Sequence, residues 1–287
     1  DTDSCYVNAE PLLRKLYPNF DDMEESDKAD KLEAMSLEYE KKINEYYNDL
    51  ALEAFNIPVE KHRLEMKTEC TIRSAFFSGK RRYAQYITKK EGVPCNEIDV
   101  KGLDFMKSNF PPLFKEFFEN ILNKILFGGT REEIDKQILD FKNSLNTLPF
   151  EKISKPTGVK RIQKYTARGP SADEIFSEFE NKAPVGVKAA VRYNDLLKFK
   201  GLDKKHTQIV EGDKIKWVYL RDNPYKIDTM GFLDFDLPNS IRKFIEEYVD
   251  IPRSFDTILK NKLESFYQDL GWGNLTLNTY VQQFFKF

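Results

Sequence analysis

The chain has 287 residues, of which 40% are hydrophobic and 32% charged, and its net charge is −2. This length and composition predict one large hydrophobic core or two smaller ones. No apolar run approaches the roughly 18 residues that a membrane span needs. Cys5, Cys70 and Cys95 are too few and too scattered for a disulfide framework or a zinc site. We therefore expect a soluble protein with reduced thiols, in a cytoplasm and without a membrane partner.

Charge is unevenly distributed along the chain. Residues 1–60 hold 16 Asp and Glu against 6 Lys and Arg, whereas residues 152–222 hold 16 Lys and Arg against 9 Asp and Glu. This uneven distribution of charge would suit a protein that binds cations at one end and a polyanion at the other. Ordinary sorting of surface charge explains the same pattern equally well.

The first part of the chain predicts a strand, a short helix and a long helix. Residues 1–7 have the pattern of a strand, and residues 11–23 that of a short helix followed by a turn. Apolar residues then recur at spacings of three and four, which predicts an amphipathic helix from Ser26 to Phe55. Ser26 is the expected N-cap, and Asn56 is expected to end the helix.

Two strands and then a change of pattern follow. Residues 64–72 alternate between apolar and polar, and residues 82–88 form a second predicted strand after a turn at Ser78-Gly79. From Gly102 onward the pattern is mostly helical with basic loops, so we place a domain boundary there. The expected elements are helices at 111–125, 130–145, 188–199, 240–248 and 255–270, and a strand at 214–220. The predicted fold class is α+β.

Three groups of residues could support chemistry. Asp1 and Asp3, two apart on a strand, would project from one face and could hold magnesium ions together. Glu69 lies on the polar face of the next predicted strand and could join them. Solvated strand ends and sheet faces show the same residues, and on the short motif alone this explanation is favoured.

A basic turn is the next candidate. In Gly79-Lys80-Arg81-Arg82-Tyr83, three consecutive cations precede an aromatic residue at the start of a strand. Alternate side chains could then contact a phosphate backbone and a groove edge. A run of charge on a solvated face is an equal alternative.

In this order, the motifs resemble family-B DNA polymerases, especially those of T-even-like tailed phages. The resemblance begins with Asp1-Thr2-Asp3-Ser4, Glu69 and the basic turn, and it covers nearly the whole chain. The further matching segments are Lys101-Gly102-Leu103-Asp104, Lys107-Ser108, residues 184–194, Gly212-Asp213-Lys214-Ile215 and residues 220–224. The order of the motifs is more specific than any one of them.

The resemblance implies a division of the chain and roles for its residues. Residues 1–101 would be the C-terminal part of a polymerase palm, a small antiparallel sheet backed by the long helix. Residues 102–287 would be a mostly α-helical thumb with a clamp-binding-like tail. Asp3 would bridge the metal ions, Asp1 would support the site, and Glu69 would lie near the metal pair. The residues expected to contact DNA are Lys80, Arg81, Arg82, Tyr83, Lys107, Lys188, Tyr193 and Asn194. Phe284, Phe285 and Phe287 would bind a sliding clamp, or else pack on the thumb itself.

The resemblance also implies an incomplete active site. A complete site would hold two Mg²⁺ ions, primer-template DNA and a deoxynucleoside triphosphate. The family's other metal-binding aspartate motif, its fingers helix and its exonuclease carboxylates do not occur in this sequence. We therefore expect an inactive portion that needs an N-terminal polymerase portion, from the same chain or a separate one, and that leaves apolar surface exposed without it. A viral source would place it in the host cytoplasm.

Two other interpretations stay open. The chain could be a non-catalytic module that binds primer-template and a sliding clamp. It could also be an unrelated basic helical protein, which would not explain an ordered match across several separate segments.

Overall fold

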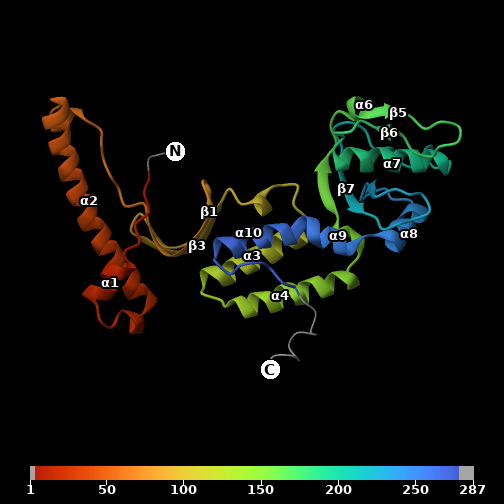
Figure 1. Ribbon diagram of the computed structural model, residues 1–287. Helices are drawn as coiled ribbons and strands as arrows, with labels where there is room; N and C mark the ends of the chain where they lie inside the picture. The colour runs from red at the N-terminus through yellow and green to blue at the C-terminus, as the bar shows by residue number, and fades with distance from the viewer. Residues whose placement is uncertain (1–3, 278–287) are drawn as a thin grey trace, which may run out of the picture. The chain divides into compact units, whose positions relative to one another are not determined.

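The computed structural model describes residues 4–277, and the chain divides into two compact units between Lys101 and Gly102 (Figure 1). Both units combine helices with small antiparallel sheets, so the predicted α+β class is confirmed. Within residues 4–277, no helix is both long enough and apolar enough to cross a membrane.

The N-terminal unit contains a three-stranded antiparallel sheet in the order β1-β2-β3. The strands are β1 (Cys70–Gly79), β2 (Arg82–Lys90) and β3 (Val93–Lys101). The helices are α1 (Glu10–Leu16) and α2 (Glu25–Phe55), and short 3₁₀ turns lie at Phe20–Asp22 and Val59–Lys61. The turn between β1 and β2 uses Gly79 at φ 142° and Arg81 at φ 61°, and the turn before β3 uses Gly92 at φ 80°. Glycine adopts these positive φ values without the steric cost that a Cβ brings.

The helix α2 begins and ends close to its predicted limits. Its N-cap residue is Glu24, which makes no side-chain cap, so the prediction of Ser26 as N-cap was wrong. Asn56 follows the helix in the left-handed conformation at φ 53°, a residue type that ends helices in this way. Lys89 of β2 ties the helix to the sheet, because its ammonium group pairs with Asp30 at 2.5 Å and Glu33 at 2.6 Å.

The predicted strand over residues 64–72 forms only from Cys70 onward. Residues 64–69 instead run back beside α2, as Figure 1 shows, and bond to its polar side chains. Asn44 accepts from the backbone N–H of Met66 at 2.7 Å and donates to its carbonyl at 2.9 Å, and Glu40 accepts from the N–H of Thr68 at 2.7 Å. Four residues of helix rise about 6 Å and two extended residues about 6.6 Å, so the two spacings match.

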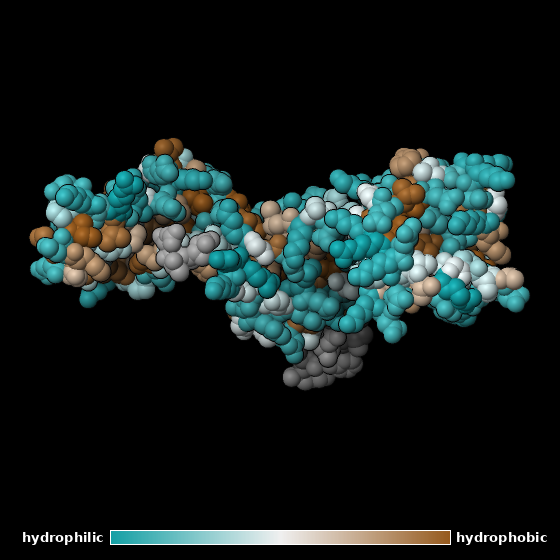
Figure 2. Space-filling model, turned by 90° about the horizontal axis from the view of Figure 1, so that it is seen from above, coloured by the Kyte–Doolittle hydropathy of each residue, from teal (hydrophilic) through white to brown (hydrophobic). Residues whose placement is uncertain are grey.

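Much of the apolar surface in the N-terminal unit is solvent-exposed, and Figure 2 shows hydrophobic residues (brown) at its surface. Only Ala29 and Ala51 of α2 are buried, whereas Tyr46 and Phe55 on the same helix are 61% and 64% exposed. The apolar spacing that predicts this helix therefore does not place Tyr46 in a core. The helix has an apolar surface that this unit does not cover.

The C-terminal unit is richer in helices and has a larger core. Its main helices are α3 (Pro112–Leu126), α4 (Arg131–Ser144), α7 (Val185–Phe199), α8 (Asn239–Tyr248), α9 (Ile251–Phe255) and α10 (Asn261–Asp269), with one-turn helices α5 (Phe150–Ile153) and α6 (Ile162–Tyr165). Its strands are β4 (Lys155–Gly158), β5 (Thr166–Arg168), β6 (Glu178–Phe179), β7 (Lys214–Tyr219) and β8 (Thr229–Phe232). Short 3₁₀ turns lie at Asp104–Met106 and Leu145–Thr147.

One of these helices begins as its sequence predicts, and another predicted helix is interrupted. Thr130 caps α4 with a complete capping box, in which Glu133 bonds back to the cap backbone. The predicted helix over residues 255–270 is interrupted, because a π-helical turn at Asp256–Lys260 separates α9 from α10. Such turns are rare and lie within α-helices.

The helix α7 packs closely on the sheet β4-β7-β8. A Cβ built on Gly231 of β8 would lie 2.9 Å from the backbone of Ala189, so only glycine fits between strand and helix. On the same sheet, Trp217 is 5% exposed and contacts Tyr219 edge to face, with 5.0 Å between ring centroids. This close packing fixes α7 and the residues of the predicted DNA-contact segment to the sheet.

Candidate nucleic-acid interface

The basic turn lies at one end of the N-terminal sheet. Lys80 and Arg81 are exposed in the turn between β1 and β2, and Arg82 begins β2. Tyr83 faces Phe77 across the hairpin, with 5.8 Å between the ring centroids. The turn therefore presents cations beside an aromatic pair, an arrangement that can contact phosphates and the sugar-base edge of a nucleic acid.

The segment after Asp3 approaches the same end of the sheet. Tyr6 packs edge to face on Phe77 at 5.1 Å and on Tyr83 at 5.9 Å between centroids. Burial, followed by the neighbouring hydroxyl of Tyr83, raises the pKa of Tyr6 well above its ordinary value. Residues 4–9 are not a strand, so the predicted strand over 1–7 was wrong in its described part. Aromatic packing on the hairpin, and not strand pairing, holds this segment.

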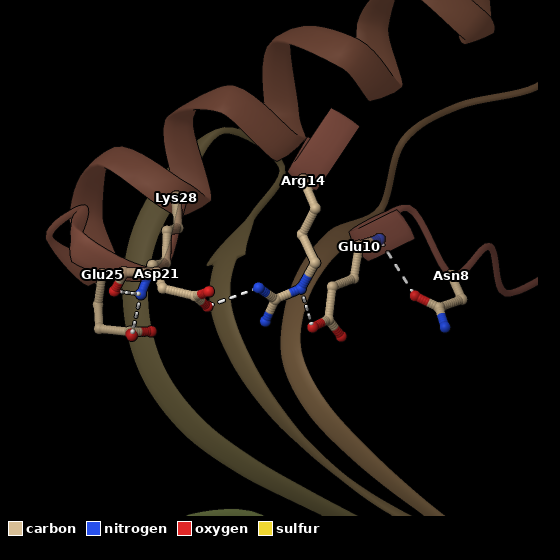
Figure 3. Close-up of polar contacts among 6 residues, drawn as sticks. All are labelled: Asn8, Glu10, Arg14, Asp21, Glu25 and Lys28. Carbon is tan, nitrogen blue, oxygen red and sulfur yellow. Dashed lines mark hydrogen bonds and ion pairs between the residues drawn. The ribbon is translucent and has the colours of Figure 1, made fainter. Parts of the chain in front are cut away.

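The start of α1 is fixed by a chain of polar contacts (Figure 3). Asn8 accepts from the backbone N–H of Glu10 at 3.1 Å. The guanidinium of Arg14 pairs with Glu10 at 2.8 Å and with Asp21 at 2.6 Å, which joins α1 to the turn that follows it. These bonds restrain the chain directly after Tyr6. They raise the pKa of Arg14 further, first through Asp21 and then through Glu10.

The structure describes only one of the three predicted metal ligands, Glu69. Asp1 and Asp3 lie outside the described residues. Asp3 is three residues from Tyr6, which is at most about 11 Å of chain. Glu69 is exposed directly before β1, at the opposite end of that strand from the basic turn. Among residues 4–277, no group of three or more His, Cys, Asp and Glu side chains could hold a metal ion.

Two of the predicted DNA-contact lysines have side chains that are at least partly exposed. Lys107 pairs with Asp104 at 2.6 Å, and its side chain is 64% exposed. Lys188, on α7, is half-buried and has no carboxylate partner in the part of the chain that the structure describes. Each could reach a phosphate group.

Tyr193 and Asn194, also predicted to contact DNA, are both bonded to the backbone of the C-terminal unit. Tyr193 is fully buried, and its hydroxyl donates to the backbone oxygen of Asp236 at 3.0 Å. The amide of Asn194 is occupied by the backbone of Ile209, donating at 2.7 Å and accepting at 2.8 Å. Both residues hold α7 to the loops around it, a role that their sequence pattern does not reveal.

A basic segment of the C-terminal unit, residues 152–164, has cations that form no ion pair within the described part of the chain. Its cations have no carboxylate within ion-pair distance among residues 4–277; they are Lys152, Lys155, Lys160, Arg161 and Lys164. Unpaired cations on a surface raise the local potential and attract polyanions. The sequence is rich in lysine here, but no motif distinguishes any of these residues. The three tail aromatics Phe284, Phe285 and Phe287 lie outside the described residues.

Comparison with known proteins gives one local similarity. No model of a known protein family matches the chain. A 60-residue segment, 21% of the chain, is 37% identical to the DNA polymerase alpha catalytic subunit of Arabidopsis thaliana. That segment spans 4% of the length of the plant protein. The chain is thus similar over a short stretch to a DNA polymerase catalytic subunit.

Proposed function

We propose that this chain is the C-terminal portion of a family-B DNA polymerase, with residues 1–101 in the palm and residues 102–287 in the thumb. The observation on which this rests is the local similarity to a DNA polymerase catalytic subunit. The order of the motifs along the chain supports it. The relative is a plant protein, so the resemblance to phage enzymes rests on the motifs alone.

In this proposal the chain contributes half of a two-metal site for template-directed DNA synthesis. Asp3 and Asp1 would hold magnesium with support from Glu69, since carboxylate oxygens are the ligands that Mg²⁺ takes from proteins. When bound, the metal ions would supply charge stabilisation at the reacting phosphate. The contact of Tyr6 with Tyr83 supports the arrangement, because it holds the chain near Asp3 beside the basic turn.

The residues of the turn would bind the primer end. Lys80, Arg81 and Arg82 would neutralise phosphates without regard to sequence, as synthesis on any template requires. Tyr83 would lie against the sugar-base edge. In the thumb, Lys107 and Lys188 would contact the duplex backbone farther along.

The proposed partners follow from what the N-terminal unit leaves uncovered. Its exposed apolar residues, such as Tyr46 and Phe55, would pack on the N-terminal polymerase portion, which would also bring the other metal-binding aspartate and the triphosphate site. The tail with Phe284, Phe285 and Phe287 would bind a sliding clamp. The assembled enzyme would act in the cytoplasm.

A second candidate is a non-catalytic module that binds primer-template and a clamp. The unpaired cations of residues 152–164 favour it, since they serve binding without chemistry. Glu69, at the far end of β1 from the basic turn, also fits a site in which it has no catalytic part. The two candidates differ in one consequence: only the half-site needs Asp3 for extension of a primer.

The experiment that tests DNA recognition compares three labelled DNAs by fluorescence anisotropy: a recessed primer-template, a blunt duplex and a single strand. We expect the chain to prefer the recessed primer-template and to lose affinity steeply as KCl rises. The variant K80A/R82A should lose this preference, whereas K41A, an exposed lysine on α2, should keep it. Equal weak binding to all three DNAs would refute both polymerase-related candidates.

A further inference from the structure

Three aromatic rings form a partly exposed cluster at the end of the sheet that carries the basic turn. Tyr83 of β2 lies opposite Phe77 of β1 in the strand register, with 5.8 Å between the ring centroids. Tyr6, from the segment before α1, contacts both rings edge to face, at 5.1 Å from Phe77 and 5.9 Å from Tyr83. Tyr6 and Phe77 are 48% and 49% exposed. The cluster therefore joins two parts of the chain that are far apart in sequence, and part of its surface stays accessible.

A hydroxyl contact gives the pair of Tyr6 and Tyr83 an orientation that ring packing alone does not. Burial raises the pKa of Tyr6 well above its ordinary value, and a hydrogen bond with Tyr83 raises it further, as expected when the Tyr6 O–H is the donor. The hydroxyl of Tyr83 then keeps its own proton to donate to a ligand. The backbone of Tyr83 is held in the central strand, opposite Phe77 and Lys101. Tyr6 is thus a contact that sets where the Tyr83 hydroxyl points.

Tyr6 also anchors its own segment on the sheet. Residues 4–8 are exposed and lie outside any helix or strand, and the segment is next fixed where α1 begins, at the buried Ala9. Asp3 precedes Tyr6 by three residues, which is at most about 11 Å of chain. Because the rings are in contact, a shift of the Tyr83 ring must move the Tyr6 ring. That movement is transmitted to the segment that carries Asp3.

We propose that Tyr6 is a positioning residue that couples Tyr83, the proposed contact of the primer end, to the segment that carries Asp3. This inference rests on the proposed function, which assigns Tyr83 and Asp3 to the polymerase site. A correctly paired primer end leaves Tyr83 against the sugar-base edge, and Tyr6 then keeps Asp3 in place for extension. A mispaired end alters the shape of that edge, displaces the Tyr83 ring and, through Tyr6, moves the Asp3 segment.

The coupling makes the rate of extension depend on the fit of the last base pair. The cations of the basic turn cannot supply this dependence, because contacts to phosphates carry no information on the bases. Tyr6 contributes it without contacting the DNA itself. Removal of the coupling should therefore affect the choice between primer ends more than the affinity for primer-template.

The experiment mixes the full chain with a separately produced N-terminal portion of a family-B polymerase and measures kcat and KM for extension of matched and mismatched primer ends. Y6A removes the ring and the hydroxyl, Y6F removes only the hydroxyl, and V7A is the matched control at the neighbouring residue, which is 77% exposed. We expect Y6A to lower kcat on the matched primer about tenfold, because small misplacements of reacting groups cost up to about a hundredfold. The KM for primer-template should change little. The ratio of kcat/KM for matched over mismatched ends should fall by about tenfold in Y6A, by less in Y6F, and not in V7A.

A second readout needs no extension. A primer with 2-aminopurine at its 3′ end reports contact of the terminal base with an aromatic side chain, because stacking quenches its fluorescence. With the chain alone at saturating concentration, we expect quenching by the wild type and V7A, and weaker quenching by Y6A. This readout decides the inference if the mixture does not extend the primer, and Y6F keeps the test decisive if Y6A folds poorly.

The outcomes separate the inference from the proposed function. A Y6A variant that loses rate equally on matched and mismatched primers has only a structural defect, and this result overturns the inference. Wild-type quenching and a wild-type ratio in both Y6A and Y6F overturn it as well, and leave the proposed function intact. A wild type that neither quenches the primer end nor extends it overturns the proposed function, and the inference with it.

Discussion

Asp236 shows how a single side chain holds the C-terminal unit together. Its carboxylate accepts from the backbone N–H of Thr207 at 2.6 Å and is bonded to the Nδ1 atom of His206 at 2.6 Å. Its backbone oxygen accepts from the buried Tyr193 hydroxyl. The loop that contains His206 is thereby fixed to α7 through one residue. A lone histidine in a sequence is more often such a hydrogen-bonded residue than a catalyst, and His206 is one.

The substitution Asp236→Asn should make the free energy of unfolding less sensitive to a fall in pH. The Thr207 amide, followed by His206, lowers the pKa of Asp236 to about 2, whereas an unfolded Asp has a pKa near 3.9. A depressed pKa stabilises the fold above the unfolded value and loses this effect as pH falls through the folded value. Urea unfolding should therefore show a wild-type advantage of about 1–2 kcal/mol at pH 7 that shrinks from about pH 4 to pH 2.

The control for this prediction is Asp222→Asn. Asp222 also pairs with a cation, but its side chain is 84% exposed, and exposed pairs contribute little to stability. Equal effects of the two substitutions at every pH would show that the contacts of Asp236 do not stabilise the loop.

At the scale of elements, the side chains of Glu40 and Asn44 on α2 explain why residues 64–69 are extended without joining the sheet. Asn44→Ala removes two hydrogen bonds to the backbone of Met66. We expect a loss of about 1–3 kcal/mol in the stability of this unit and faster amide hydrogen exchange at Met66 and Thr68. The exposed α2 variant K41A should change neither. Unchanged exchange at Met66 in N44A would mean that side-chain bonding does not hold this segment.

The contact of α7 with β8 gives a second prediction for an element. Gly231→Ala places a methyl group about 2.9 Å from the backbone of Ala189, so strand and helix must separate. Overpacking of this kind costs about 1–3 kcal/mol. Gly158→Ala, on strand β4 of the same sheet, where an added Cβ meets nothing within 4 Å, is the matched control. Thermal unfolding that shows equal stability for the two variants would contradict the packing.

The elements differ in how far their sequence determines them. Helices bounded by local signals, such as α4 with Thr130 or α2 with Asn56, follow from the sequence because caps act over one turn. The extended but unpaired conformation of residues 64–69 did not follow from the sequence, because side chains of a helix 22 to 28 residues away bond to their backbone as a neighbouring strand would. The strand β3 was not predicted, because Pro94 lies at its start and proline is unusual within a strand. The π-helical turn at Asp256–Lys260 has no sequence signal that periodicity could detect.

For the whole molecule, the two units differ in how well they bury their apolar residues. Within the described residues, the first unit leaves large hydrophobic residues exposed along α2 and its neighbours, whereas α3 of the second buries Phe114, Phe118 and Ile121 almost completely. Contiguous exposed apolar surface marks a binding surface. This agrees with the sequence expectation of uncovered apolar surface, and in the proposed function the polymerase N-terminal portion covers it.

Binding of a hydrophobic dye tests this exposed surface. We expect anilinonaphthalene sulfonate to fluoresce with the chain, and L52S/F55S on α2 to reduce the signal without lowering the melting temperature, since both side chains are more than half exposed. F235S, which removes an exposed aromatic side chain of the other unit, should have little effect. If the dye does not fluoresce with the wild type, the apolar surface is covered in solution.

The candidate site was predictable where motifs are local and not where it depends on three-dimensional register. The basic turn at Lys80–Arg82 follows from sequence order. Tyr193 fits the pattern of the polymerase motif yet is buried, and the pattern contains no signal of that burial. Lys155 lies opposite Trp217 in the sheet and over its ring, although the two residues are 62 apart in sequence. No periodicity or spacing brings these residues together before the fold is known.

The most direct test of the central claim is primer extension with Mg²⁺. The chain is mixed with a separately produced N-terminal portion of a family-B polymerase, and the initial extension rate is compared for the wild type, D3A and D49A. Asp49 is an exposed carboxylate on α2 and serves as the matched control. We expect no extension by either part alone, extension by the mixture and by the mixture with D49A, and none with D3A. A mixture that binds primer-template but never extends it, or that extends it equally well with D3A, would contradict the half-site and favour a binding module.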